Sequence, residues 1–325
     1  MTAAEILARV PGVAVLVVGD VCLDRWCTYD PAQADVSRET GLPRIGVVAT
    51  EATPGAAGTV CNNLRAMGVG PVAAMSVAGG DGFGFELRQA LDARQVSHEH
   101  VIEQPGWTTF TYTKLLNCVT GSEDLPRVDF INTRPLPAEA QRALIDRLPG
   151  AVEAAGAVLV SDQAETDEGG VVTAAVRDTL ADLALAYPGK PFVVDSRRRI
   201  EHFRHMILKP NRDEADTACL RVGGGYRELR QHTRAPLLAV TRGADGVLLI
   251  DERGERLIPA PAVAAVVDIC GAGDSFAAGM GAALAAGATP DEAVRFGHLV
   301  ASVTITKKGT GVATPEEILH ADARY

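Results

Sequence analysis

The segment Val267–Gly281 reads VDICGAGDSFAAGMG and combines residue types that suit phosphoryl transfer. Gly271 and Gly273 remove side chains just before a predicted helix, so backbone N–H groups and the helix dipole can hold an anion there. Asp274, in the first turn, can accept the proton of an attacking hydroxyl group beside that anion. The helix dipole is expected to keep this carboxylate ionised at neutral pH. An ordinary helix start, with a tight glycine turn capped by Asp274, explains the run equally well.

Two further runs carry groups that suit the same chemistry. In KPNRDE, the side chains of Asn211 and Glu214 are three residues apart and share one face of a helix begun by Pro210. GDVCLD ends at Asp24 and follows a predicted first strand, where α/β sheets bind ligands. Each run alone is also typical of a helix start or a turn.

The elements that must position these residues alternate between buried strands and helices. Nearly continuous β-branched and apolar runs predict strands at Val13–Asp20, Val72–Val77, Ala157–Ser161, Phe192–Asp195 and Leu237–Thr241. Helical periodicity appears between them, at Phe85–Arg94 and Val171–Ala186. This alternation predicts an α/β fold, with a mainly parallel sheet covered by helices on both faces.

Two β-rich stretches, at about residues 26–50 and 103–132, interrupt that alternation. The alternating run from Thr108 to Thr113 predicts an extended, half-exposed strand. We expect the two stretches to meet as a small sheet that forms a lid beside one domain, residues 1–325. An exposed sheet edge favours pairing, so a homodimer through the lid is expected.

Composition excludes several classes of protein. The 325 residues include 31 Lys and Arg against 41 Asp and Glu, a net charge of −10 that disfavours a nucleic-acid or membrane surface. No apolar run approaches the roughly 20 residues that span a bilayer, and no secretory signal is recognised at the amino end. Six scattered cysteines without paired spacing indicate a reducing compartment, so a cytoplasmic location is expected.

The run GAGDSFAAG resembles the carboxyl-terminal signature of the ribokinase-like (PfkB) sugar kinases, DTxGAGDxFxxG. The resemblance implies a three-layer α/β/α sandwich with a β-sheet lid, and Asp274 as the catalytic base. It implies an anion hole formed by Gly271, Ala272 and Gly273. Asp268 matches the leading aspartate of the signature, which implies a role at a monovalent-cation (K⁺) site. Ile269 and Cys270 depart from the small polar residues that the family has there.

Other motifs resemble the family's ATP side and follow in the family's order. TRGADG implies contacts to ATP phosphates and ribose from Thr241, Gly243 and Gly246. KPNRDE implies a nucleotide role for Lys209, with Asn211 and Glu214 near Mg²⁺ and acting largely through water, which suits a cation that keeps its hydration. KKGTG, at Lys307–Gly311, resembles the turn near the adenine and the monovalent cation.

The acceptor side resembles the heptose-7-phosphate kinases within that family. GDVCLDRW, PRVDF, VLVSDQA and VVDSRR carry this likeness. It implies a sugar or sugar-phosphate acceptor, phosphorylated at the anomeric hydroxyl if it is a heptose 7-phosphate. The implied acceptor-binding residues are Asp24, Gly55, Gly58, Thr59, Asp162 and Arg197. Guanidinium groups suit a phosphate, so Arg197 to Arg199, Lys114 and Arg127 are further candidates, although charge runs are also common on solvated surfaces.

Several acceptor-side residues depart from the pattern of those kinases. Ala56 replaces the second glycine of PGG, and Thr59 replaces the asparagine that follows. Asp124 stands in place of a Gln-Gln pair. The Asp–Tyr–x–Lys–Gly run is represented by Asp162 to Glu165, without its lysine. These departures leave open a nucleoside or other small-alcohol kinase of the same fold, or a relative that binds ligands without catalysis.

Overall fold

The computed structural model describes residues 1–166 and 169–324. In this part of the chain a nine-stranded sheet has the order β15–β14–β13–β12–β11–β10–β1–β6–β7, parallel except for the antiparallel pairs that β14 makes with β13 and β15. The strands are β1 (Val15–Gly19), β6 (Val72–Gly79), β7 (Ser97–Gln104), β10 (Ala157–Asp162), β11 (Phe192–Ser196), β12 (Ile207–Leu208), β13 (Leu238–Thr241), β14 (Val247–Asp251) and β15 (Gly254–Ile258). The five strands predicted from apolar runs are confirmed.

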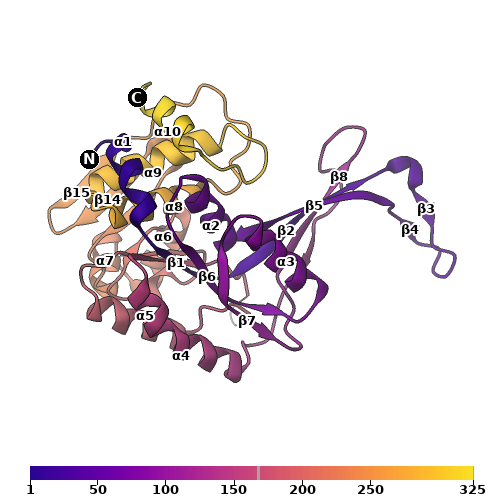
Figure 1. Ribbon diagram of the computed structural model, residues 1–325, viewed down its shortest axis with the longest axis horizontal. Helices are drawn as coiled ribbons and strands as arrows, with labels where there is room; N and C mark the ends of the chain where they lie inside the picture. The colour runs from indigo at the N-terminus through magenta and orange to yellow at the C-terminus, as the bar shows by residue number, and fades with distance from the viewer. Residues whose placement is uncertain (167–168, 325) are drawn as a thin grey trace.

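Helices cover both faces of this sheet (Figure 1). In β1, Val15 and Val17 pack into one apolar cluster, whereas Leu16 and Val18 pack into another, because successive side chains point to opposite faces. The first face carries α1 (Ala3–Arg9), α2 (Ala57–Ala66), α3 (Gly82–Asp92), α8 (Ala272–Ala285), α9 (Pro290–Thr304) and α10 (Pro315–Asp322). The second carries α4 (Ala138–Ala154), α5 (Ala174–Ala186), α6 (Arg212–Val222) and α7 (Tyr226–Thr233). The predicted three-layer arrangement is confirmed.

A second, four-stranded sheet projects from the main body (Figure 1). Its order is β5 (Val47–Ala56), β2 (Val21–Tyr29), β8 (Thr111–Asn117) and β9 (Val128–Phe130). The short pair β3 (Asp35–Val36) and β4 (Pro43–Arg44) lies at the far end of this projection. The small sheet confirms the lid predicted from the two β-rich stretches. Its strands reach closer to the main sheet than predicted, because β2 begins directly after β1 and β5 runs into α2.

The carboxyl ends of the central strands meet at one edge of the large sheet. Asp20 follows β1, and Asp162 ends β10. Asp195 is the last residue but one of β11, and Thr241 ends β13. The lid leaves the body at this edge, and α8 begins there. Ligands in open α/β sheets bind outside the carboxyl ends of strands, so this edge is where a site is expected. Among the described helices, none combines the length and apolar character that crossing a bilayer requires.

Candidate active site

The GAGD turn forms the amino end of α8. Gly271 is the N-cap and has φ = 74°, in the left-handed region that favours glycine. A methyl group on Gly271 would also lie 3.2 Å from Thr310 Cγ2 and 3.3 Å from Thr59 Cγ2. Asp274 stands in the first helical turn, where N–H groups lack intrahelical acceptors and favour an anion. The glycine turn and helix start read from the sequence are confirmed, and the anion-hole role of Gly271 to Gly273 stays a prediction.

Asp274 lines a cavity of ≈ 200 Å³ between the lid and the carboxyl edge of the sheet. The lid contributes Asp24, Trp26, Tyr112, Lys114 and Arg127 to its wall. The segments that follow β10 and β11 contribute Gln163, Glu165 and Arg197, and the GAGD turn contributes Cys270 and Gly271. The cavity therefore joins the proposed base to the acceptor-side residues, which are up to 250 positions away in the chain.

The pKa of Asp274 is raised to about 7. Burial is the main cause, and the negative charge of Asp195 adds to it, whereas Lys209 and Arg197 act in the opposite direction. Desolvation therefore acts against the helix dipole, which was expected to keep this carboxylate ionised at neutral pH. A carboxylate with a pKa near 7 is well matched to general base catalysis at neutral pH.

A buried ion pair lies directly behind the GAGD turn. Lys209 is 2 % exposed, and its Nζ lies 2.8 Å from Asp195 Oδ2. A methyl group on Gly273 would lie 3.7 Å from that Nζ, so the amine faces the backbone of the turn. Lys209 was predicted as a site residue from its motif, whereas Asp195 was not. The position of Asp195 at the end of a buried parallel strand is the signal that could have identified it.

Asn211 and Glu214 bind each other at the start of α6. The Asn211 side chain accepts a hydrogen bond from the N–H of Glu214 (2.9 Å), and the Glu214 carboxylate accepts one from the N–H of Asn211 (2.8 Å). This is a capping box, and the helix begins at Arg212 rather than at Pro210. Burial and the charge of Asp195 raise the pKa of Glu214 to about 7. The water-mediated magnesium role of the pair stays a prediction.

The remaining phosphate-side candidates lie in turns at the same edge. Thr241 ends β13, and its N–H donates to the carbonyl of Pro210 (2.9 Å). Gly243 begins the short helix η4 (Gly243–Asp245). Gly246 has φ = 94°, and a methyl group there would lie 2.1 Å from Ile258 O, so a glycine is required for the hairpin itself. Contacts from these residues to a nucleotide stay predictions.

Asp268 connects two of the family-like motifs. One carboxylate oxygen accepts a hydrogen bond from the N–H of Cys270 (2.9 Å), and the other accepts one from the N–H of Gly309 (3.0 Å). The aspartate thus ties the GAGD turn to the KKGTG turn. This placement agrees with a role in organising that region, and binding of a monovalent cation stays a prediction.

Asp24 lies in β2 and faces Gly55 on the neighbouring strand β5. A methyl group on Gly55 would come within 2.4–2.5 Å of three atoms of the Asp24 carboxyl group. Burial raises the pKa of Asp24 to about 6, and Cys22, Lys114 and Arg127 partly oppose the shift.

Two other acceptor-side candidates lie at the start of α2. Gly58 packs against Pro54, where a methyl group would be 2.5 Å from Pro54 Cβ. Thr59 is 1 % exposed, and its hydroxyl has no hydrogen-bond partner among the described residues. Because Thr59 also lines the cavity, this buried hydroxyl is a candidate partner for a bound molecule.

Asp162 is buried and held by protein groups. It forms an ion pair with Arg199 (2.7 Å) and accepts a hydrogen bond from the Ser196 hydroxyl (2.6 Å). The residue after it, Gln163, lines the cavity. The structure thus places Asp162 behind the wall, and the acceptor-binding role predicted for it stays a prediction.

Asp20 fixes the turn that follows β10. Its carboxylate accepts hydrogen bonds from the N–H groups of Gln163, Ala164 and Val171, each at 2.8 Å. Burial and the neighbouring Asp162 raise its pKa to about 6. Asp20 is therefore a turn residue that orients part of the cavity wall.

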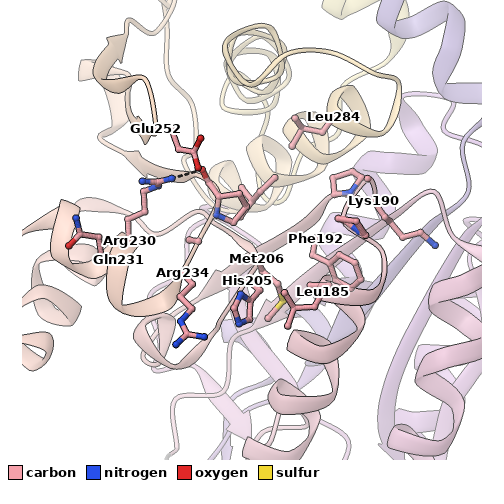
Figure 2. Close-up of a pocket in the computed structure, with 17 residues that line it drawn as sticks. Leu185, Lys190, Phe192, His205, Met206, Arg230, Gln231, Arg234, Glu252 and Leu284 are labelled. Atoms are coloured by element: carbon pink, nitrogen blue, oxygen red, sulfur yellow. Dashed lines mark hydrogen bonds between the residues drawn. The ribbon is translucent and has the colours of Figure 1, made fainter.

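A larger cavity, of ≈ 670 Å³, lies at the opposite edge of the large sheet (Figure 2). Lys190 and Phe192 line it at the start of β11, and His205 and Met206 line it just before β12. These are the amino ends of parallel strands, where ligands of such sheets do not usually bind. Despite its smaller volume, the cavity beside Asp274 holds the candidate chemistry. No group of three or more potential metal-ligating side chains occurs within residues 1–166 and 169–324.

The fold and the site together define an α/β small-molecule kinase. The family model for the pfkB family carbohydrate kinases matches residues 15–317. The chain therefore belongs to the pfkB family of carbohydrate kinases, which are phosphotransferases. It is 32% identical to the bifunctional protein HldE of Caulobacter vibrioides and 33% identical to that of a Caulobacter species, over 97% and 98% of this chain. It spans only 65% and 66% of the length of those relatives.

Solved structures share the fold at lower identity. Ribokinase from Thermotoga maritima superposes with a TM-score of 0.67 at 19% identity, covering 95% of this chain and 99% of that one. Phosphofructokinase-2 from Escherichia coli, determined in complex with potassium, gives 0.70 at 20% identity, covering 96% and 98%. These likenesses confirm the ribokinase-like architecture of a large sheet with a small-sheet lid.

Proposed function

We propose that this chain transfers the γ-phosphate of ATP to a hydroxyl group of a sugar or sugar phosphate, with Asp274 as the general base. The observation that carries the proposal is that Asp274 at the GAGD turn and Asp24 on the lid line one cavity. One end of that cavity offers first-turn N–H groups to an anion, and the other offers Asp24 and Thr59 to hydroxyl groups.

In this proposal each group has a defined task. Asp24 and Thr59 orient the acceptor so that the reacting hydroxyl points at Asp274. Asp274 accepts the hydroxyl proton as the oxygen attacks, and the N–H groups at Gly271 to Gly273 stabilise charge on the transferred group. Lys209 adds positive charge behind the turn, since its Nζ faces the Gly273 backbone. Closure of the lid would exclude water and limit ATP hydrolysis.

The residues present fit ATP with Mg²⁺. Kinases of this chemistry use Mg²⁺ to neutralise phosphate charge, and the ion keeps several waters rather than a full protein ligand cage. The oxygen-bearing Asn211 and Glu214 are the proposed outer ligands, and Lys209 is the proposed phosphate contact. A bound K⁺ near Asp268 is proposed from the resemblance, together with the potassium complex of the E. coli phosphofructokinase-2.

Activity is expected to depend on pH through Asp274. The base works only when ionised, so kcat/KM for the acceptor should rise about tenfold per pH unit below a pKa of about 7 and level off above it. The measurement is kcat/KM from pH 5.5 to 9 at saturating ATP and Mg²⁺. A profile that stays flat through pH 7, or that falls as the pH rises to 8, would count against Asp274 as the base.

The acceptor class is open to a direct screen. The resemblance to heptose-7-phosphate kinases makes an anomeric hydroxyl of a heptose 7-phosphate the first candidate, with Lys114, Arg127 and Arg197 as possible phosphate contacts on the cavity wall. Trp26 and Tyr112 on the same wall would suit a nucleoside base instead. We propose a coupled ADP-release assay against sugars, their phosphate esters and nucleosides. No ADP release above the acceptor-free rate for any acceptor would contradict kinase activity.

We also propose that a second copy of the chain packs against the lid. Its large side chains Val36, Leu42 and Val48 are 54%, 65% and 58% exposed, on the part that projects farthest from the body (Figure 1). Val48→Glu should convert a dimer into a monomer, because it places a charge in an apolar contact. Light scattering with size-exclusion chromatography measures this. Leu220→Glu on α6, an 84% exposed site away from the lid, is the control that should stay dimeric. A monomeric wild type at micromolar concentration would contradict the proposal.

The chain is further proposed to act as one kinase domain in a reducing, cytoplasmic compartment. The two large apolar clusters pack on opposite faces of a single sheet. All six cysteines lie in the described ranges and are free thiols. Both features support the proposal.

A further inference from the structure

Several residues that depart from the family patterns gather at one place. Five of them, spread over more than 200 positions in the chain, line the cavity beside Asp274: Ala56, Thr59, Gln163, Glu165 and Cys270, whereas Asp124 and Ile269 do not. Ala56, which replaces a glycine of the pattern, keeps the glycine-type backbone at φ = 52° and ψ = −118°. The backbone of the site is thus retained while its side chains differ. Such a distribution indicates a change in what the cavity accepts.

Glu165 makes the largest chemical change, because it places a carboxylate where the pattern has a lysine. Its Oε1 lies 2.5 Å from Nη1 of Arg197, the one arginine of the Arg197 to Arg199 run that is among the residues lining the cavity. Arg198 donates a hydrogen bond to the backbone carbonyl of Glu165. Asp20 holds the residues just before it through their N–H groups. Glu165 is therefore positioned from both sides, and it neutralises Arg197 at the cavity wall.

The other basic residues of the cavity are also paired. Lys114 lies 3.6 Å from Glu123, Arg25 lies 3.4 Å from Glu86, and Arg127 binds Asp129 at 2.7 Å. Asp24 and Asp274 add two carboxyl groups to the wall. An entering phosphate dianion would have to displace Glu165 from Arg197 and remain close to it, so like-charge repulsion would oppose binding. A sugar hydroxyl meets no such barrier, since it can donate to Glu165 and accept from Arg197.

We propose that Glu165 is a specificity-determining residue that makes the acceptor site favour an uncharged sugar over the phosphate ester of the same sugar. The inference rests on the proposed kinase function and narrows its acceptor class. It predicts that the charge at position 165, rather than the shape of the cavity, sets this preference. Restoring the pattern's lysine should therefore reverse it.

The test compares two probes, a heptose and its 7-phosphate ester, which differ only by the phosphate group. Dissociation constants are measured by calorimetry, and kcat/KM by ADP release. The wild type should bind the uncharged heptose at least as tightly as the ester. In Glu165→Gln, the preference for the ester over the uncharged sugar should rise about tenfold, and in Glu165→Lys it should rise further, as expected for charges that are partly screened by solvent. The KM for ATP should not change.

Glu255→Gln is the matched control, because Glu255 lies on the remote strand β15 and pairs with an exposed arginine of α7, Arg227. It should leave the preference unchanged. A wild type that binds the ester more tightly than the uncharged heptose, or variants whose preference equals that of the wild type, would overturn the inference. Failure of the wild type to release ADP with any acceptor of the screen, these two probes included, would contradict the proposed function alone, because the binding ratios still test Glu165. Absence of binding of both probes to all three proteins would contradict both proposals.

Discussion

Asp274→Asn is expected to reduce phosphoryl transfer by about 10³-fold, within the range that removal of a general base usually costs. The amide has nearly the same size as the carboxyl group, so the α8 turn and the ion pair of Lys209 with Asp195 should persist. An amide cannot accept the proton of the attacking hydroxyl. ATP binding should survive, because the substitution removes a negative charge next to the phosphate-binding turn and should, if anything, strengthen it.

The measurement is kcat from ADP release, together with the dissociation constant for ATP–Mg²⁺. Asp178→Asn provides the control, since that aspartate is exposed on α5 and pairs only with the surface residue Arg204 in the described contacts. It should retain wild-type kcat. Turnover by Asp274→Asn within a few-fold of the wild type would remove Asp274 from the role of base. If both variants unfold at the same temperature as the wild type, a lower kcat of Asp274→Asn reflects the loss of a catalytic group and not a loss of folded protein.

Gly55→Ala is expected to raise the acceptor KM about 100-fold while the KM for ATP stays unchanged. The added methyl group would lie 2.4 Å from the Asp24 carboxyl group, a distance that cannot be accommodated without displacing that side chain or strand β5. Asp24 is the proposed ligand of acceptor hydroxyl groups, and misplaced binding groups can cost about this factor. The ATP side lies at the other end of the cavity and makes no contact with Gly55 in this proposal.

Gly150→Ala in α4 is the matched control, because a methyl group there would meet nothing within 4 Å. It should leave both KM values unchanged and slightly stabilise the helix. A thermal unfolding measurement shows whether Gly55→Ala is folded, and so separates a weaker acceptor affinity from a loss of the fold. If a folded Gly55→Ala protein kept the wild-type acceptor KM, Asp24 would not be the acceptor ligand.

Much of the phosphate side could be predicted from the sequence because its determinants are local. The GAGD turn needs a residue with left-handed backbone conformation at Gly271 and a carboxylate three positions later. Both requirements can be recognised in the four-residue sequence GAGD. The capping box of Asn211 and Glu214 is equally local. The buried strands were identifiable because a parallel sheet covered on both faces requires uninterrupted apolar runs.

Other features of the site depend on segments that are distant in the chain. Asp195 reaches Lys209 only because β11 and β12 are neighbours in the sheet. The pKa of Asp274 depends on burial and on the charges of Asp195, Lys209 and Arg197, which lie in distant segments. Glu165 was visible as a departure, but its ion pair with Arg197 could not be read from the sequence, because it joins the segments that follow β10 and β11.

By itself, then, the sequence determined the class of chemistry through the ordered set of ATP-side motifs, because the turn around Asp274, the other motifs and the strand pattern are properties of short segments. The tertiary structure alone decided which acceptor-side residues share a cavity with Asp274. It also decided how their charges are paired. The physical reason is that an electrostatic environment depends on distances through space and on exclusion of water, and both are set by the packing of the lid against the strand ends.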